Sequence, residues 1–137
     1  MKLNPYITFA GNAEEALNFY KECLQGEIRN ISRYVDAPLE SPDDYKQKIM
    51  HAVLAFGTNL IMAADVLPGK TIPTEGNIRL SVDIIDPVEM DKVFNALSTG
   101  GVITMPIQET FWGARFGMLR DRFGIEWMFN CELPKKN

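Results

Sequence analysis

The side chains best suited to bind or transform a small molecule lie in the second half of the chain. Arg79 and Ser81 alternate along one predicted strand, and Glu126, Met128 and Asn130 alternate along another. Because alternate residues of a strand point to the same side of a sheet, each set is expected to share one face. That face is either a solvated sheet surface, which antiparallel sheets often have, or the wall of a binding cavity.

Trp112 and Arg115 belong to residues 109–129, for which the sequence predicts two antiparallel strands joined by a tight turn at 121–124. We expect both side chains in the turn that precedes the first of these strands. The fork of an arginine matches two oxygens of a carboxylate or phosphate. The functional hypothesis is that Arg115, with Arg79, pairs with an anionic group of a ligand and that Trp112 forms a stacking wall. The alternative is a packing tryptophan and a solvated arginine.

Two residues are candidates for a general base, His51 and Glu126. His51 is the single histidine of the chain, so it cannot build the multi-histidine sites typical of zinc enzymes. Its position on a predicted strand favours a structural histidine with a hydrogen-bonded ring over a catalytic one. Glu126, on a partly apolar wall, is suited to proton transfer. Whether the protein is an enzyme stays open.

Other catalytic signatures are absent from the sequence. It has no Ser/His/Asp order, no phosphate-binding glycine loop and no nucleophile elbow. Cys23 and Cys131 share no CxxC spacing and are expected to be reduced thiols.

Size and charge set further limits. The 137 residues suit one compact domain, with Lys and Arg numbering 14, Asp and Glu 18, and a net charge of −4. Basic residues do not cluster as in a nucleic-acid-binding protein. There is neither an apolar signal core at the N-terminus nor an apolar run long enough to span a membrane. A cytoplasmic protein with no nucleic-acid or membrane partner is therefore expected.

The first half predicts a strand, a helix and three more strands. Apolar residues at helical spacing indicate the helix, with Asn12 as its N-cap and Glu15 completing a capping box. The predicted strands are residues 4–9, 27–35, 49–56 and 59–65, and the helix is 13–24.

The second half repeats this order after a linker at 67–77 that contains two prolines and two glycines. Asp86 is the expected cap of its helix, with Pro87 at the first position. Its predicted strands are residues 78–84, 102–108, 116–120 and 125–131. Each half alone would leave an apolar sheet face uncovered, so the halves are expected to form one domain. The fold class is α+β, with βαβββ modules at about 1–66 and 78–137.

Three stretches of sequence carry a family resemblance. They are residues 4–9 with 11–16, residues 48–52 with 62–65, and residues 108–117 with 121–128. On these residues the whole chain resembles the PhnB-like branch of the glyoxalase/bleomycin resistance/dioxygenase (vicinal oxygen chelate) superfamily. The resemblance implies two βαβββ modules in a cupped, mixed sheet. Some relatives carry a ubiquinone-methyltransferase label, which no nucleotide-cofactor motif here supports.

The resemblance also implies where a metal ion would be held. Catalytic members place one His, Glu or Gln on each of four strands, and the matching positions here are Pro5, Ala63, Asn77 and Met128. None is a good ligand for a divalent cation, and Asn77 is only a weak oxygen donor. We therefore expect no metal and no cofactor. A site rebuilt from Glu126 and His51 is the alternative.

Together these observations predict a metal-free protein that binds a small molecule with an anionic group, and the resemblance implies a homodimer. The expected ligand-binding residues are Arg79, Ser81, Trp112, Arg115, Glu126, Met128 and Asn130. One alternative is a metal-independent enzyme with Glu126 or His51 as general base. A second is a protein that sequesters a drug in the manner of bleomycin resistance.

Overall fold

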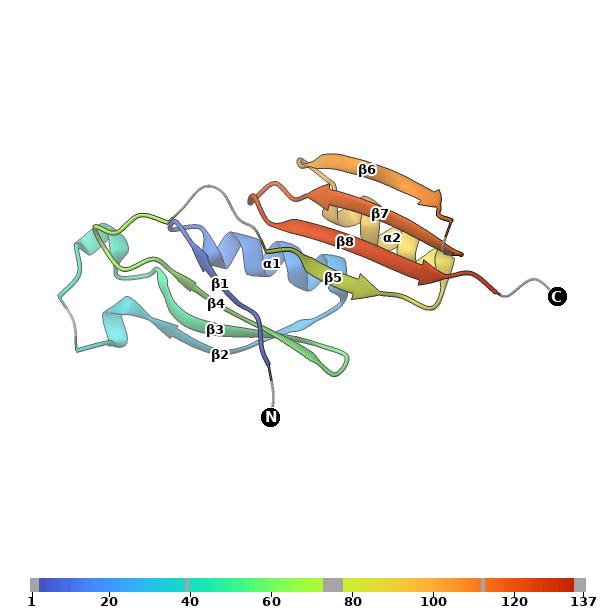
Figure 1. Ribbon diagram of the computed structural model, residues 1–137. Helices are drawn as coiled ribbons and strands as arrows, with labels where there is room; N and C mark the ends of the chain where they lie inside the picture. Colours follow the sequence, from blue (N-terminus) through green and yellow to red (C-terminus); the bar gives the residue numbers. More distant parts are fainter. Residues whose placement is uncertain (1–2, 39, 73–77, 112, 135–137) are drawn as a thin grey trace. The chain divides into compact units, whose positions relative to one another are not determined.

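The structure is a computed structural model that describes residues 3–38, 40–72, 78–111 and 113–134. The chain divides into two compact units, Met1–Thr74 and Glu75–Asn137. Within these described ranges, each unit has one α-helix and one four-stranded sheet (Figure 1).

The first unit follows the order strand, helix, three strands. Its elements are β1 (Tyr6–Phe9), α1 (Ala13–Leu24), β2 (Glu27–Arg33), β3 (Ile49–Phe56) and β4 (Asn59–Asp65), with short 3-10 helices at Tyr34–Asp36 and Asp43–Tyr45. The sheet order is β1-β4-β3-β2, in which β1 is parallel to β4 and the other pairs are antiparallel.

The second unit repeats this topology. Its elements are β5 (Leu80–Asp83), α2 (Pro87–Leu97), β6 (Val102–Glu109), β7 (Ala114–Arg120) and β8 (Glu126–Glu132). The sheet order is β5-β8-β7-β6, again with one parallel pair, β5 with β8. The predicted α+β fold of two βαβββ units is therefore confirmed.

Several element ends differ from the predictions. β5 begins at Leu80, two residues later than predicted, and Ile78 is 77% exposed. β2 ends at Arg33, because residues 34–36 turn into a 3-10 helix that buries Tyr34. β7 begins at Ala114, before the predicted start, because the backbone N–H of Thr110 donates to the carbonyl oxygen of Ala114 and closes the preceding turn.

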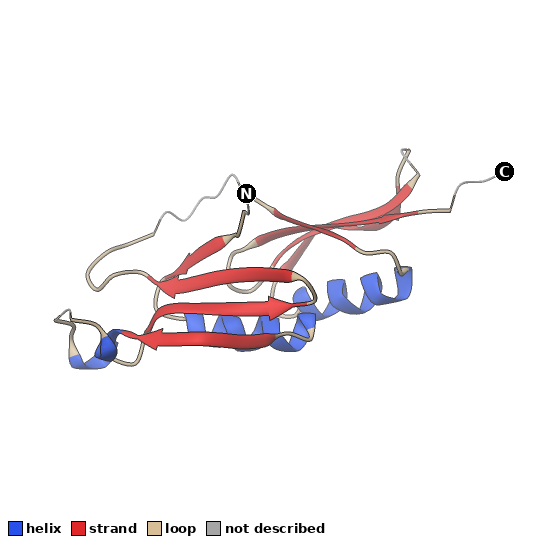
Figure 2. Ribbon diagram, turned by 90° about the horizontal axis from the view of Figure 1, so that it is seen from below, coloured by secondary structure: helices blue, strands red, loops and turns tan. Residues whose placement is uncertain are grey.

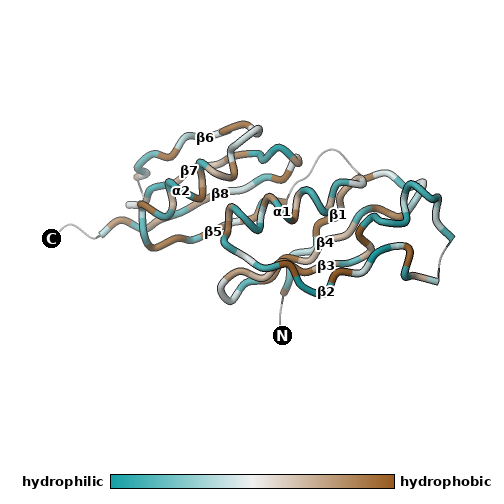
Figure 3. The backbone as a smooth tube through the Cα atoms, turned by 180° about the vertical axis from the view of Figure 1, so that it is seen from behind, coloured by the Kyte–Doolittle hydropathy of each residue, from teal (hydrophilic) through white to brown (hydrophobic). Residues whose placement is uncertain are grey.

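α1 covers one face of the first sheet (Figure 2). The residues of α1 at helical spacing that point to the sheet are buried: Ala13, Ala16, Leu17 and Tyr20. They meet the apolar residues Ala52, Leu54 and Ile61 of the central strands, which are 0–4% exposed. Figure 3 shows the resulting alternation of hydrophilic and hydrophobic residues along the helix. Burial of such side chains is the main source of stability in this unit.

The start of α1 differs from the predicted capping box. Asn12 makes no side-chain cap hydrogen bond. Instead, the buried Asp65 at the end of β4 accepts from the backbone N–H of Ala13 through Oδ1 and from that of Ile49 through Oδ2, both at 2.8 Å. Asp65, which is distant in sequence, thus accepts a hydrogen bond from a free N–H group at the start of α1 and links the helix to the sheet.

α2 covers one face of the second sheet with Met90, Phe94 and Leu97. The Phe94 ring packs edge-on against Phe129 of β8, with centroids 5.6 Å apart. The predicted cap of α2 is confirmed, since Asp86 accepts from the backbone N–H of Val88 at 3.0 Å and Pro87 follows it. Within the described residues, no helix has the length and apolar character needed to cross a bilayer.

Candidate functional site

The face of the second sheet opposite α2 carries most of the predicted ligand-binding residues. Cross-strand partners point to the same side of a sheet, so the register identifies neighbours. Ser81 pairs with Met128, Met128 with Met118, and Met118 with Met105. The residues on either side of Met128 are buried at 0–1% exposure in the layer under α2, so this row lies on the other face. We call that side the open face of the second sheet.

A charged row flanks the methionines. Glu126 pairs in register with Arg120, and Arg120 Nε donates to Glu126 Oε1 at 2.7 Å. The Glu126 side chain is 16% exposed and the Arg120 side chain 54% exposed. As an ion-pair partner of an arginine, Glu126 has one carboxylate oxygen already engaged.

Arg79 adds a second cation to this row. It immediately precedes β5 and is exposed. The parallel register that pairs Leu80 with Trp127 places position 79 alongside Glu126. Within the described residues Arg79 makes no ion pair, so its guanidinium can receive an anion.

The third row is polar and aromatic. Asp83 pairs with Asn130, Asn130 with Phe116, and Phe116 with Gln108. The open face therefore has charged residues at one end, thioethers in the middle, and a carboxylate, amides and a phenyl ring at the other end. This combination of apolar surface and a few fixed polar groups is typical of small-molecule sites.

Arg115 lies apart from these residues. It belongs to β7, whereas the sequence predicted a turn position. Its Nη2 donates to Asp91 Oδ1 at 2.9 Å and its Nη1 to the carbonyl oxygen of Pro87 at 3.4 Å, and both partners are on α2. The guanidinium therefore lies on the helix-covered side. Trp112, its predicted companion, lies outside the described residues.

His51 lies in the first unit, on the side of the first sheet away from α1. The Tyr6 hydroxyl is 3.2 Å from His51 Nδ1, and the two ring centroids are 5.7 Å apart. Burial raises the pKa of the Tyr6 phenol, so its hydroxyl keeps its proton at neutral pH. This pairing with a ring nitrogen matches the hydrogen-bonded histidine predicted from the sequence.

An open hollow of about 640 Å³ lies at the N-terminal end of α1. It contains none of the predicted ligand-binding residues. Its lining is polar: Gly11, Asn12, Glu14, Glu15, Asn18, Asp44, Gln47, Lys48 and Asp65.

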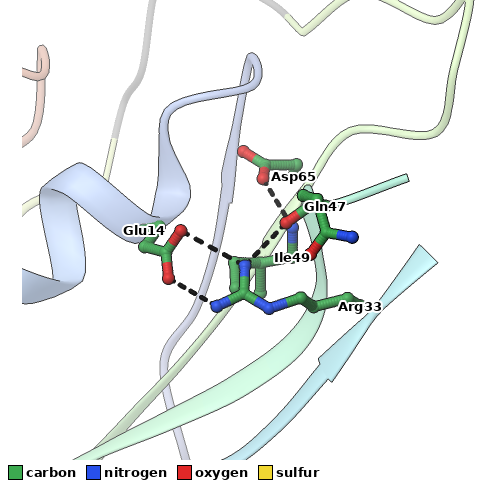
Figure 4. A network of polar contacts seen from close by, with 5 residues as sticks. All are labelled: Glu14, Arg33, Gln47, Ile49 and Asp65. Atoms are coloured by element: carbon green, nitrogen blue, oxygen red, sulfur yellow. Dashed lines mark hydrogen bonds and ion pairs between the residues drawn. The ribbon is translucent and has the colours of Figure 1, made fainter. Parts of the chain in front are cut away.

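Several charged groups beside this hollow make hydrogen bonds or ion pairs (Figure 4). Arg33 donates to both carboxylate oxygens of Glu14, at 3.2 and 2.6 Å, and to the carbonyl oxygen of Gln47 at 2.6 Å. The hydrogen bond from Arg33 lowers the pKa of Glu14, and the same bond raises the pKa of Arg33. Lys48 Nζ donates to the carbonyl oxygen of Gly11 at 2.7 Å. This network joins β2 and the segment before β3 to the N-terminal part of α1, and it engages the charged groups of Glu14, Arg33 and Lys48.

The residues present do not fit the divalent-metal site of catalytic members of the superfamily. Within the described residues, no three His, Cys, Asp or Glu side chains gather where they could hold a metal ion. Ala63, which matches a metal-ligand position of those members, pairs with Ile7 and Ala52 and is 0% exposed in the layer under α1. Met128 offers only a thioether, a poor ligand for hard cations. Asn77 lies outside the described residues.

Two βαβββ units, each with a mixed sheet covered by one helix, define the glyoxalase/bleomycin resistance fold. Solved structures of this fold match the chain at low sequence identity. A glyoxalase family protein from Bacillus cereus has a TM-score of 0.68 at 17% identity, covering 98% of this chain and 97% of that one. The fosfomycin resistance protein FosX from Listeria monocytogenes has a TM-score of 0.68 at 10% identity, covering 96% and 93%.

Closer relatives place the chain in a family. A family model described as 3-demethylubiquinone-9 3-methyltransferase matches residues 1–129. Protein YjdN of Escherichia coli K12 is 31% identical over 140 residues, which cover 95% of each chain. The chain therefore belongs to this family, the PhnB-like branch of the glyoxalase/bleomycin resistance superfamily.

Two solved structures support this placement. Protein PA1353 from Pseudomonas aeruginosa is 39% identical with a TM-score of 0.88, covering 98% of this chain and 99% of that one. A putative 3-demethylubiquinone-9 3-methyltransferase, PhnB protein, from Bacillus cereus is 30% identical with a TM-score of 0.76, covering 96% and 99%.

Sequence reasoning missed several residues of the two sheet faces. Met118, Phe116 and Arg120 share the open face with Met128. Alternation along β7 could have placed them there, because the buried Leu119 fixes which side faces α2. Tyr6 could not have been paired with His51 from the sequence, because the two residues meet only through the sheet order.

Proposed function

We propose that this protein binds a small organic acid on the open face of the second sheet, without a metal ion. The acid group is held by Arg79, with the Ser81 hydroxyl of the neighbouring row as a hydrogen-bond partner. Asn130, two rows from Arg79, hydrogen-bonds the far end of the ligand. The body of the ligand lies over Met128 and Met118.

The observation that carries the proposal is the register that groups these side chains on one face of one sheet. Arg79 is exposed at the edge of that face, whereas Glu126 is held by Arg120 and leaves the row with a net positive charge. A guanidinium suits a carboxylate because it donates two parallel hydrogen bonds. Methionine side chains adapt to ligands of different shape, which suits the middle of the face.

Isothermal titration against a panel of small carboxylic acids tests the proposal. Loss of a charged hydrogen bond costs about 1.5–3 kcal/mol, so Arg79→Ala should weaken binding roughly 10- to 150-fold. Arg115→Ala is the matched control, because that arginine contacts α2 on the other side of the sheet, and it should leave the affinity unchanged. Equal affinities in wild type and Arg79→Ala would refute the role of Arg79.

A metal-independent enzyme is the second candidate, supported by the hydroxyl partner that orients His51. In this hypothesis Glu126 or His51 removes a proton from an acidic C–H or O–H group of the ligand. If a turnover reaction is found for the bound acid, Glu126→Gln and His51→Gln should each be assayed. Full activity in both variants would eliminate this mechanism.

The proposal includes a cytoplasmic homodimer, as the sequence and its family resemblance predict. Light scattering of the purified protein should then give twice the mass of one chain. A monomer at micromolar concentration would contradict the dimer without affecting the ligand site.

A further inference from the structure

We propose that Tyr6 and His51 form a second acid-binding element, on the side of the first sheet away from α1. In this pair the Tyr6 hydroxyl donates to His51 Nδ1, so that the Nε2–H group is presented to an oxygen of a carboxylate. The acid site proposed on the second sheet does not use this pair, and the two sites can fail independently.

The sheet brings the two residues together across β4. Tyr6 is on β1 and His51 on β3, with β4 between these strands. Tyr6 pairs with Met62, and Thr8 pairs with Ala64, which places both β4 residues on the same side as the Tyr6 ring. Because Ala64 carries only a methyl group, the phenol can reach over β4 to the imidazole at 3.2 Å. The two rings are tilted by 38°.

The hydrogen bond determines what His51 can offer to a ligand. A neutral imidazole has one N–H donor and one bare nitrogen acceptor. A phenol is a better donor than acceptor, and the raised pKa of Tyr6 keeps its proton in place. When the hydroxyl donates to Nδ1, the ring proton is on Nε2. If His51 becomes protonated, Nε2 still carries a proton, so this nitrogen is a donor in both charge states.

The surroundings select the class of ligand. Ser32 is the cross-strand partner of His51 and adds a hydroxyl on the same side. Met62 pairs with Val53 and provides an apolar surface next to Tyr6. Two charged residues of β2, Glu27 and Arg29, form an ion pair at 3.0 Å. Hydrogen-bond donors beside an apolar surface fit a carboxylate attached to a hydrophobic body, such as an aryl acid.

The single histidine makes the tautomer directly measurable. Two-dimensional ¹⁵N–¹H spectra of the protein labelled at histidine give the signals of one imidazole. At a pH where His51 is neutral, the expected pattern is that of the Nε2–H tautomer. Tyr6→Phe should shift the signals toward a mixture of tautomers. Tyr45→Phe, which removes a hydroxyl bound to the carbonyl oxygen of Val66, is the matched control and should leave the pattern unchanged.

Benzoate is the probe for binding, because it joins a carboxylate to a flat apolar ring. The Nε2 signal of His51 should move in a saturable manner as benzoate is added. His51→Phe keeps a ring but has no donor, and benzoate affinity at this element should fall at least tenfold. His51→Gln keeps an N–H donor near the Nε2 position and should retain part of the affinity.

Two results would overturn the inference. One is an Nδ1–H tautomer in the wild-type protein, which leaves Nε2 as a bare acceptor and supports the general-base mechanism. The other is an Nε2 signal that does not respond to benzoate at concentrations that saturate the protein. Arg79→Ala separates the two sites, because it removes the anchor on the second sheet and should leave the His51 response intact.

Discussion

Asp121 and Trp127 are joined by a buried hydrogen bond from the indole Nε1–H to Asp121 Oδ2, at 2.9 Å. The other oxygen of Asp121 accepts from the backbone N–H groups of Phe123 and Ile125, at 2.9 and 3.0 Å. One carboxylate therefore holds both the turn between β7 and β8 and the largest buried side chain of the second unit. It fixes the start of β8, the strand that contributes Met128 and Asn130 to the open face.

Asp121→Asn should destabilise the protein by about 1–3 kcal/mol. The amide can keep one oxygen toward the backbone, but its NH₂ group then faces the indole N–H, which leaves two buried donors in contact. Urea unfolding followed by tryptophan fluorescence measures the loss. Asp86→Asn is the control, because asparagine caps a helix as well as aspartate does, and its cost should be small. An equal decrease in the free energy of unfolding for the two variants would contradict the assigned role of Asp121.

The N-terminal end of α1 gives a second prediction, because the cap found in the structure differs from the cap predicted from the sequence. Asn12→Ala should change the free energy of unfolding by less than about 0.5 kcal/mol, because the Asn12 side chain makes no cap hydrogen bond. Asp65→Asn should cost about 1–3 kcal/mol, because one of the N–H groups of Ala13 and Ile49 would then face an NH₂ group. Chemical denaturation of both variants measures the two losses of stability and shows whether that of Asp65→Asn is the larger. A larger loss in Asn12→Ala would restore the predicted capping box.

The ion pair of Glu14 with Arg33 predicts a pH dependence of stability. Hydrogen bonding to Arg33 lowers the pKa of Glu14 below its ordinary value of 4.5. A carboxyl group whose pKa is lower in the folded state stabilises the protein above pH 4.5, and that contribution is lost as the pH falls through the folded pKa. The raised pKa of Arg33 acts only at far higher pH. Because the Glu14 side chain is 53% exposed, the contribution at pH 7 should be below about 1 kcal/mol.

Urea unfolding of Glu14→Gln and wild type at pH 7 and at pH 3 measures this contribution. The difference between the two proteins should shrink at the lower pH. Glu22→Gln is the control on the same helix, because Glu22 is exposed and makes no ion pair within the described residues. A difference for Glu14→Gln that stays constant with pH would contradict the account.

Close packing of β7 against α2 gives a fourth prediction. A Cβ atom at Gly117 would lie 2.9 Å from Ile107 Cγ1 and 2.9 Å from Phe94 Cε2. Gly117→Ala should therefore cost about 1–3 kcal/mol by overpacking. Thermal unfolding measures the loss, and a variant as stable as wild type would show that Phe94 can move away freely.

The sequence predicted the fold well because its helices and strands have strong local signals. The order strand, helix, three strands was recognised in both halves, and α1, β3 and β4 have the predicted bounds. Asp86 was identified as a cap because the residues that it caps follow it directly. Sheet alternation also grouped Ser81 and Met128 correctly on one side.

The errors occurred where distant residues decide the local structure. Asp65 replaces Asn12 as the partner of the first N–H of α1, and the two aspartate contacts depend on the sheet order. Arg115 was expected in a turn, yet it belongs to β7 and donates to Asp91 of α2, 24 residues earlier in the chain. A local sequence pattern does not predict such contacts, because it contains neither the register of the strands nor their order in the sheet.

The most direct test of the central claim is a titration of the protein with ¹³C-methyl-labelled methionine. The acid that binds best in the calorimetric panel is added while the methyl signals are followed. The account predicts saturable shifts for Met118 and Met128 and none for Met90, which is 0% exposed beneath α2. Signals of Met118 and Met128 that stay in place at saturation would contradict binding on the open face of the second sheet.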